Sequence, residues 1–325
     1  MDKIRIGIVG YGNLGRGVEL SINQNEDMEL IAIFTRRNPS EIKGAKDNMV
    51  HISKIESYVG KIDIMILCGG SATDLQNQGP DIAKLFNTVD SFDTHAKIPE
   101  YFDKMNDVAT NAKNLSIISV GWDPGLFSIA RLLGNVALPQ GQDYTFWGKG
   151  VSQGHSDAIR RIEGVANAIQ YTVPLQDALD KVRNESLPNL TTREKHERVC
   201  YVVAKENADL DKIENEIVNM PNYFKDYNTV VNFISEEELK TNHSGMPHGG
   251  TVIRKGITGN DTDQRIEFSL ELGSNPEFTS SVLVCFARAV HRLANEGKVG
   301  AISVFDVPFT YLSIKEPAQL RKELL

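Results

Sequence analysis

The chain has 325 residues, of which 41% are hydrophobic and 24% are charged, which is ordinary for a soluble globular protein and long enough for two domains. Its net charge of −8, without a block of like charges, excludes the basic stripe that a nucleic-acid binder needs. Apolar runs such as Ile62–Cys68 are too short to span a bilayer. Because a strand begins at Ile4, no room is left for a signal peptide, and we expect a cytoplasmic protein.

The three cysteines, Cys68, Cys200 and Cys285, lie far apart and inside apolar runs. An odd number without paired spacing fits neither a disulfide framework nor a metal site. We therefore interpret them as core residues and expect no bound metal.

The first third of the chain alternates apolar runs of strand length with amphipathic helices. The predicted strands are Ile4–Val9, Leu30–Phe34, Ile62–Cys68, Thr88–Phe92 and Leu115–Val120. A helix is predicted to begin near Pro99 and to carry Tyr101, Met105 and Ala112 on its apolar face. Near-continuous apolar strands separated by helices indicate a doubly wound α/β fold with a parallel sheet covered on both faces.

Beyond residue 122 the pattern changes to helices mixed with strands, which predicts an α+β domain on a mixed or antiparallel sheet. The expected helices are Ser156–Ala168, Leu175–Arg183, Leu210–Val218 and Thr279–Asn295. The expected strands are Tyr144–Gly148, Val199–Val203, Thr229–Ile234, Thr251–Lys255 and Arg265–Leu272. We expect one domain of residues 1–122 and a second of residues 123–278, with residues 279–325 packing back on the first.

A glycine-rich turn links the first strand to the following helix. It reads Gly10-Tyr11-Gly12-Asn13-Leu14-Gly15. In this context the first glycine makes the tight turn, the second lets backbone amides approach a pyrophosphate, and the third permits close helix–strand packing. The helix N-terminus then faces the phosphates with unpaired N–H groups. The sequence therefore predicts a dinucleotide-binding Rossmann domain.

The second strand ends in Thr35-Arg36-Arg37, where an NAD enzyme usually carries an acidic residue that holds the ribose 2′-hydroxyl. Guanidinium groups bind phosphate oxygens well, whereas a carboxylate would repel them. The expected cofactor is therefore NADP. A second glycine-rich turn, Cys68-Gly69-Gly70-Ser71-Ala72-Thr73, follows the third strand and is predicted to line the pyrophosphate or the nicotinamide ribose.

Aspartates follow two further strands of the predicted sheet. Asp93 comes after the fourth strand, and Trp122 and Asp123 come after the fifth. Both segments should project from the carboxyl edge of the sheet, beside the nicotinamide. Two carboxylates there suit an ammonium group.

The second domain offers residues for a carboxylate and an apolar wall, namely Arg198, His248 and Trp147. For each of these residues taken alone, a structural role is the simpler interpretation. The residues by themselves define only a polar, zwitterionic small molecule as the substrate.

Taken together, these motifs resemble the meso-diaminopimelate D-dehydrogenase family. The matching segments are Val9–Gly15, Phe34–Arg37, Gly121–Gly125, Thr145–Gly148, Ser152–Asp157 and Gly245–Gly250. The glycine-rich turn is shared by many dehydrogenases, whereas the later segments are specific. The resemblance implies a homodimer that uses NADP to oxidise the D-centre of meso-diaminopimelate to L-2-amino-6-oxopimelate and ammonia, in lysine and cell-wall precursor synthesis.

The resemblance also assigns roles to residues. Asp93 and Asp123 would bind the reacting amino group and act in catalysis. The other substrate-binding residues that it implies are Trp122, Trp147, Gln153, Gly154, Thr172, Arg198, His248 and Asn275. Trp122 and Trp147 would shape the pocket, and the last four would anchor the distal L-centre. Whether Asp123 or a water molecule accepts the proton stays open.

Two other interpretations are compatible with the first domain. One is an NADP-dependent dehydrogenase of another amino-acid pathway, such as a homoserine or aspartate enzyme, which does not need Arg198 or the Gly245–Gly250 segment. The other is a non-catalytic NADP sensor, which needs no Trp-, His- and Asp-rich loops at the sheet edge. A substrate panel separates all three.

Overall fold

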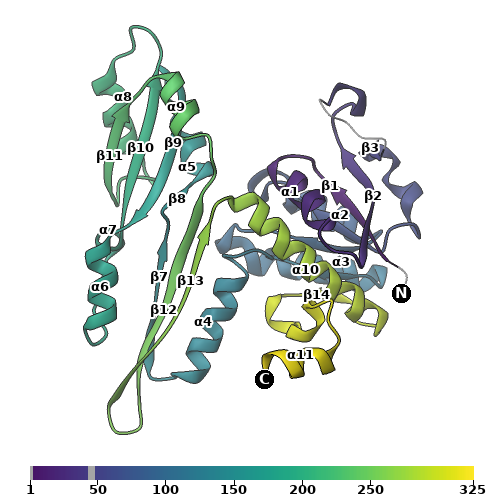
Figure 1. Cartoon of the computed structure of the whole chain (residues 1–325). Coiled ribbons are helices and arrows are strands. Elements are labelled where there is room, and N and C mark those ends of the chain that lie inside the picture. The colour runs from purple at the N-terminus through teal and green to yellow at the C-terminus, as the bar shows by residue number, and fades with distance from the viewer. Residues whose placement is uncertain (1–2, 43–47) are drawn as a thin grey trace. The chain divides into compact units, whose positions relative to one another are not determined.

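The computed structural model describes residues 3–42 and 48–325. The chain forms two compact units (Figure 1). Unit 1 comprises Met1–Ile129 and Pro276–Leu325, and unit 2 comprises Ala130–Asn275. The C-terminal segment therefore belongs to the same unit as the N-terminus.

Unit 1 is built on a seven-stranded parallel sheet with the order β14-β6-β5-β4-β1-β2-β3. The strands are β1 (Ile4–Val9), β2 (Met28–Thr35), β3 (Met49–His51), β4 (Ile64–Leu67), β5 (Asn87–Asp90), β6 (Leu115–Ile117) and β14 (Gly300–Ile302). The chain runs from β1 outward to β3 and then returns to β4 on the other side of β1. This reversal beside β1 is the switch point where doubly wound folds bind ligands.

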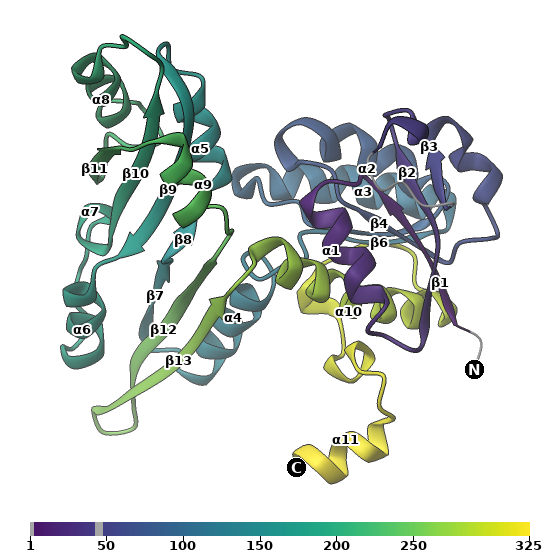
Figure 2. The ribbon, with the colours of Figure 1, turned by 45° about the horizontal axis from the view of Figure 1, so that its top comes forward.

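Consecutive strand residues point in opposite directions, so these apolar strands present side chains on both faces of the sheet. Helices cover both faces. They are α1 (Asn13–Ile22), α2 (Gln76–Ala83), α3 (Ile98–Ala112) and α10 (Asn275–Asn295). Helix α11 (Pro317–Leu324) follows near the C-terminus and has no buried residue. Ile64 and Ile66 pack in one hydrophobic cluster with α1 and α10, whereas Met65 and Leu67 pack in another with α2 and α3. Figure 2 shows these two helix pairs on opposite sides of the strands. The predicted doubly wound fold is confirmed.

Unit 2 contains two smaller sheets. One is four-stranded and mixed, with the order β11-β10-β9-β8, and the other is three-stranded and antiparallel, with the order β13-β12-β7. The strands are β7 (Gly141–Trp147), β8 (Gly150–Val151), β9 (Val165–Pro174), β10 (His196–Ala204), β11 (Asn228–Phe233), β12 (His248–Thr258) and β13 (Thr262–Leu272). The predicted α+β class with mixed and antiparallel pairing is therefore confirmed.

The helices of unit 2 lie against these sheets. They are α4 (Leu126–Ala137), α5 (Gln153–Arg160), α6 (Gln176–Asn184), α7 (Thr192–Lys195), α8 (Leu210–Val218) and α9 (Glu236–Asn242), the first turn of α4 still belonging to unit 1. Helices α5 and α8 share a hydrophobic cluster with β9 and β10 through Ile159, Ile213 and Cys200. No helix among residues 3–42 and 48–325 is long and apolar enough to cross a membrane.

One predicted element is wrong. The expected helix Ser156–Ala168 ends at Arg160, and Val165 already begins strand β9. Gly164 has φ +87°, a left-handed conformation that ends helical geometry. The alternation that follows Gly164, with Val165 and Ala168 in the core, is that of a strand. Strands β3, β8, β9 and β14 and helices α2, α4, α7, α9 and α11 were not predicted from the sequence.

Candidate active site

The glycine-rich turn after β1 has the geometry that its sequence predicts. Gly10 has φ +94°, and a Cβ on Gly15 would lie 2.1 Å from the carbonyl oxygen of Gly10. A Cβ on Gly12 would meet no atom within 4 Å. Two glycines therefore serve the turn and its packing, whereas Gly12 leaves open space at the N-terminus of α1. Asn13 and Leu14 form the first turn of that helix.

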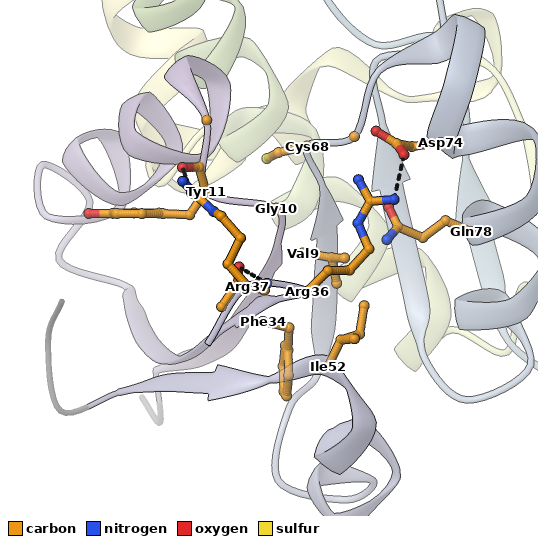
Figure 3. A pocket seen from close by; sticks show the side chains of 13 residues that line it. Val9, Gly10, Tyr11, Phe34, Arg36, Arg37, Ile52, Cys68, Asp74 and Gln78 are labelled. Carbon is orange, nitrogen blue, oxygen red and sulfur yellow. Dashed lines mark hydrogen bonds and ion pairs between the residues drawn. The ribbon is translucent and has the colours of Figure 1, made fainter. Parts of the chain in front are cut away.

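A pocket of about 310 Å³ opens beside this turn, entirely within unit 1 (Figure 3). Its lining residues are Val9, Gly10, Tyr11, Gly12, Phe34, Thr35, Arg36, Arg37, Ile52, Cys68, Gly69, Asp74 and Gln78. Most of them come from the carboxyl ends of β1, β2 and β4, at the switch point of the sheet, whereas Ile52, Asp74 and Gln78 come from the helical segments nearby. The residues that line it fit a dinucleotide, because open backbone at Gly12 and basic side chains from β2 meet in one cavity.

The two arginines after β2 have different partners. Arg37 donates from its guanidinium to the carbonyl oxygen of Tyr11 at 3.3 Å, and its backbone N–H donates to the Thr35 hydroxyl at 3.1 Å. Arg36 forms an ion pair with Asp74 at 2.9 Å, and its side chain is 71% exposed. Thr35 and Arg37 thus stiffen the pocket wall, while Arg36 reaches across its mouth.

The second glycine-rich turn contributes to the pocket only in part. Cys68 and Gly69 line the cavity, whereas Ser71, Ala72 and Thr73 begin a single π-helical turn. The Gly70 N–H donates to Asp74 at 3.2 Å. The sequence analysis did not predict Asp74, Gln78 or Ile52, because no local motif brings them to β2.

The predicted substrate residues of unit 1 follow adjacent strands. Asp93 is exposed just beyond β5, and its backbone N–H donates to the Ser71 hydroxyl at 2.9 Å. Asp123 is half-buried in the segment that follows β6. Trp122 beside it is buried, with its ring edge-on to Phe127 at 5.2 Å. The expectation that both segments extend from the carboxyl edge of one sheet is met.

In unit 2, a buried cation lies on strand β10. Arg198 is 7% exposed, unlike most arginines at the start of a strand. Its guanidinium donates to the hydroxyl of Thr172 on β9 and stacks 3.8 Å from the ring centre of Tyr227. Burial lowers the pKa of this guanidinium. Among the described residues its Nε has no hydrogen-bond partner.

Further predicted residues of unit 2 gather around Thr172. Its strand neighbour in β8 is Gly150, where a Cβ would lie 2.3 Å from the ring of His248. The backbone N–H of Asn275 donates to the Met246 carbonyl at 2.9 Å. The side chain of Gln153, which with exposed Gly154 begins α5, contacts the sulfur of Met246 at 3.2 Å. Residues that are more than 100 positions apart in the sequence therefore converge on the β8–β9 edge.

Two buried residues here were not predicted. The ring of His196 stacks on Trp147, with 5.5 Å between ring centres, and its Nε2 accepts the Trp147 backbone N–H at 2.8 Å. Gln170 is fully buried on β9, and among the described residues neither atom of its amide has a partner. Neither residue belongs to a motif, so no signal in the sequence could have found them.

The histidines near Arg198 are held neutral. Burial, reinforced by the positive charge of Arg198, lowers the pKa of His155 to about 4. Burial, with the charges of Arg198 and Lys195, lowers the pKa of His196 to about 3. At neutral pH the positive charge at this buried site is therefore that of Arg198, which suits a carboxylate ligand.

Comparisons with known proteins agree with these features. Residues 121–274 match the family model of the diaminopimelic acid dehydrogenase C-terminal domain. The chain is 63% identical, over the full length of both chains, to meso-diaminopimelate D-dehydrogenase of Lysinibacillus sphaericus. It superimposes with TM-score 0.93 and 44% identity on C. glutamicum diaminopimelate dehydrogenase in complex with diaminopimelate, covering all of both chains.

A third relative carries a dinucleotide. An engineered D-amino acid dehydrogenase bound to NADP⁺ superimposes with TM-score 0.88 and 42% identity, covering 99% of this chain and 100% of the other. The agreement extends over both units and is not confined to the Rossmann domain that many dehydrogenases share. The chain therefore belongs to the meso-diaminopimelate D-dehydrogenase family.

Proposed function

We propose that this chain oxidises the D-centre of meso-2,6-diaminopimelate with NADP, giving L-2-amino-6-oxopimelate and ammonia, in lysine and cell-wall precursor synthesis. The observation that carries the proposal is the likeness to meso-diaminopimelate D-dehydrogenases over the full length of the chain. Unit 1 presents Asp93 and Asp123 at the carboxyl edge of the sheet, and unit 2 presents the buried guanidinium of Arg198. A substrate with an ammonium group at one end and a carboxylate at the other needs both.

The residues of unit 1 act on the reacting amino acid. Asp93 and Asp123 bind its ammonium group, and a nearby carboxylate or water takes the proton that this group must lose. When bound, the oxidised nicotinamide accepts the hydride from the D-centre α-carbon. Water then hydrolyses the resulting imine to the carbonyl product and ammonia. Trp122, which is buried, shapes the pocket.

The residues of unit 2 distinguish the two ends of a nearly symmetric substrate. Arg198, Thr172, His248 and Asn275 hold the L-centre, backbone groups of Gln153 and Gly154 add contacts, and Trp147 provides an apolar wall. A diastereomer with the wrong configuration at one end leaves buried polar groups unpaired, at a cost of ~1–3 kcal/mol each. The family match over the full chain favours this assignment over a homoserine or aspartate enzyme and over a non-catalytic sensor.

The test is a comparison of meso-, LL- and DD-diaminopimelate in an NADP reduction assay. We expect strong activity with the meso isomer and weak activity with the LL isomer, which has no D-centre. Deuterium at the α-carbon of the D-centre should appear on the reduced nicotinamide, and label at the L-centre should stay in the product. Transfer of the L-centre label would reverse the assignment of the two ends.

For the cofactor, we infer that Arg36 recognises the 2′-phosphate of NADP. Because the Arg36 side chain is 71% exposed, its pair with Asp74, whose side chain is 19% exposed, contributes at most about 1 kcal/mol, less than a charge-assisted contact with phosphate. Replacing Arg36 by Ala should weaken NADP binding by ~1.5–3 kcal/mol, or about 10- to 150-fold, and NAD binding much less. Arg161→Met is the control, because Arg161 is an exposed residue of unit 2. Equal losses for both cofactors would contradict the assignment.

We also propose a homodimer formed through unit 2. Exposed apolar side chains lie on α4, where Leu133 is 51% and Val136 67% exposed, and on the edge strand β13, where Phe268 is 38% exposed. Figures 1 and 2 both draw α4 beside the β12–β13 hairpin. Sedimentation should give twice the chain mass, and Leu133→Glu combined with Phe268→Glu should give monomers. A monomeric wild type would refute the proposal.

A further inference from the structure

Unit 1 contains a buried carboxylate that the proposed chemistry does not use. Asp90 is the last residue of β5 and is fully buried, so it cannot meet a ligand from solvent. Its Oδ1 accepts the backbone N–H of Phe92 at 2.9 Å and that of Ser119 at 3.1 Å. Its Oδ2 accepts the hydroxyl of Tyr101 at 2.8 Å. Every contact is made to the protein itself.

The two backbone amides belong to the two segments that carry the proposed catalytic aspartates. Phe92 immediately precedes Asp93, and Ser119 lies four residues before Asp123. A further bond joins the same segments, since the N–H of Val120 donates to the carbonyl oxygen of Asp90 at 2.9 Å. Asp90 therefore fixes the segments that follow two adjacent strands, β5 and β6.

The conformation of the second segment depends on this connection. Ser119 has φ +59°, in the left-handed region that a side chain disfavours. Its own hydroxyl is buried and has no partner among the described residues, so the backbone N–H provides its bond to β5. A strained residue of this kind persists only where its surroundings hold it, and the Asp90 carboxylate supplies that support.

The carboxylate is not explained by stability alone. Burial raises the pKa of Asp90 to about 6, so the charged form is held at a cost in folding free energy. An apolar side chain would avoid this cost but could not accept two backbone amides. The ring of Tyr101 stacks on Phe92 at 4.1 Å, and Gly79 leaves room for the Tyr101 hydroxyl, where a Cβ would lie 2.2 Å away. The surrounding residues are thus arranged around this carboxylate.

We propose that Asp90 is a positioning residue, whose carboxylate joins the segments after β5 and β6 so that Asp93 and Asp123 meet the substrate ammonium together. The inference rests on the proposed function, which assigns the ammonium to these two aspartates. Asp90 acts through their backbone and does not touch the substrate.

The experiment compares Asp90→Ala with Asp90→Asn, using meso-diaminopimelate and NADP with the full chain. Alanine removes the acceptor for both amides, and kcat/KM should fall about 100-fold, the loss expected for misplacement by about 1 Å. Both a higher KM and a lower kcat are expected. Asparagine keeps an oxygen for both amides and can donate to the Tyr101 oxygen, so it should restore most of the activity.

Two readouts separate positioning from a purely structural role. The deuterium isotope effect on kcat/KM, with label at the D-centre, should rise in Asp90→Ala, because a misplaced substrate makes C–H cleavage slower than the other steps. NADP affinity should stay unchanged. Tyr101→Phe keeps the ring stack on Phe92 and both amide bonds, so it should lose stability with little loss of kcat/KM.

The results that would contradict the role of Asp90 differ from those that would contradict the proposed function. A wild type without turnover of meso-diaminopimelate refutes that function. An active wild type with near-normal kcat/KM in Asp90→Ala, or with equal losses in Asp90→Asn and Asp90→Ala, overturns the role of Asp90. If the alanine variant does not fold, Asp90→Ser takes its place, because its shorter side chain cannot accept both amides and reach Tyr101. The same criteria then apply.

Discussion

Buried polar groups are held differently around Asp90 in unit 1 and around Arg198 and Gln170 in unit 2. In unit 1, both oxygens of Asp90 have protein partners, and the buried hydroxyls of Thr88 and Ser116 pair at 2.8 Å. In unit 2, neither amide atom of Gln170 has a partner among the described residues, nor does the Nε of Arg198. Unpaired buried polar atoms cost about 1–3 kcal/mol each, so a folded protein rarely leaves them together without a use.

The difference indicates two ways of preparing a binding site. Around Asp90 the protein uses its buried hydrogen bonds to fix its own segments, including the backbone of Phe92, which precedes Asp93. Around Arg198 the protein leaves donors and acceptors open, so the ligand or ordered water completes the network. The predictions below test this contrast, beginning with the largest effect.

The first prediction concerns the carboxylate of unit 1. In the proposed function, Asp123→Asn removes a negative charge that would bind the ammonium, and kcat/KM for meso-diaminopimelate should fall about 10³-fold. Steady-state kinetics measures the loss, and NADP titration should show unchanged affinity. Asp103→Asn is the matched control, because Asp103 is exposed on α3. An equal loss in both variants would mean that Asp123 acts only through surface charge.

The second prediction concerns the guanidinium of unit 2. Arg198→Met keeps the apolar stem and removes the fork, and kcat/KM should fall by ~2–4 kcal/mol, about 30- to 800-fold, with both KM and kcat affected. Stability should not fall, because the variant removes a buried charge with an unpaired Nε. Urea denaturation and the Arg161→Met control complete the test. Near-normal kcat/KM, or an unfolded variant, would return Arg198 to a structural role.

The contrast between the units also marks how far the sequence could predict the structure. Gly10, Gly15 and Arg37 act within a local strand–turn–helix motif, and their geometry follows from residue type and spacing. Gln170 and Asp90 acquire their roles only when separate strands pair and bury them. The burial of Arg198 could not be predicted for the same reason, since Tyr227 covers it from 29 positions away.

The resemblance to a known family supplied what local patterns could not. It named Thr172, His248 and Asn275 as a group. Thr172 and the ring of His248 both lie beside Gly150. It assigned no role to Asp74 or His196. Residues that support a site without belonging to a motif could therefore be identified only in the structure.

The third prediction concerns the different effects of low pH on the stability of the two units. The pKa values of His155 and His196 in unit 2, about 4 and about 3, lie below the usual 6.5, so the unfolded chain binds more protons. The free energy of unfolding is therefore highest above pH 6.5 and falls as the pH is lowered. The loss at pH 5 is roughly 2 kcal/mol for each histidine. The raised pKa of Asp90, about 6, acts oppositely, because its folded form gains a proton first and unit 1 gains stability below pH 6.

Hydrogen exchange resolved by peptide, at pH 8 and pH 5 after correction for the intrinsic rate, checks this difference. Protection should fall in β9 and β10 of unit 2 and hold in β5 and β6 of unit 1. In Arg198→Met the acid loss should be smaller, because the charge of Arg198 helps to lower both histidine pKa values. Equal losses of protection in both units would show that the histidines do not cause the acid sensitivity of unit 2.

The last prediction concerns the unpaired amide itself. Gln170→Leu replaces a fully buried side chain by an apolar one of similar size and removes two unsatisfied atoms, so the free energy of unfolding should rise by about 1 kcal/mol. Thr88→Val is the matched variant in unit 1. It leaves the Ser116 hydroxyl without its partner at 2.8 Å and should lower the free energy of unfolding by about 1 kcal/mol. Urea denaturation at pH 8 measures both changes. If Gln170→Leu is instead destabilising, an ordered water already satisfies the amide, and the two units hold their buried polar groups in the same way.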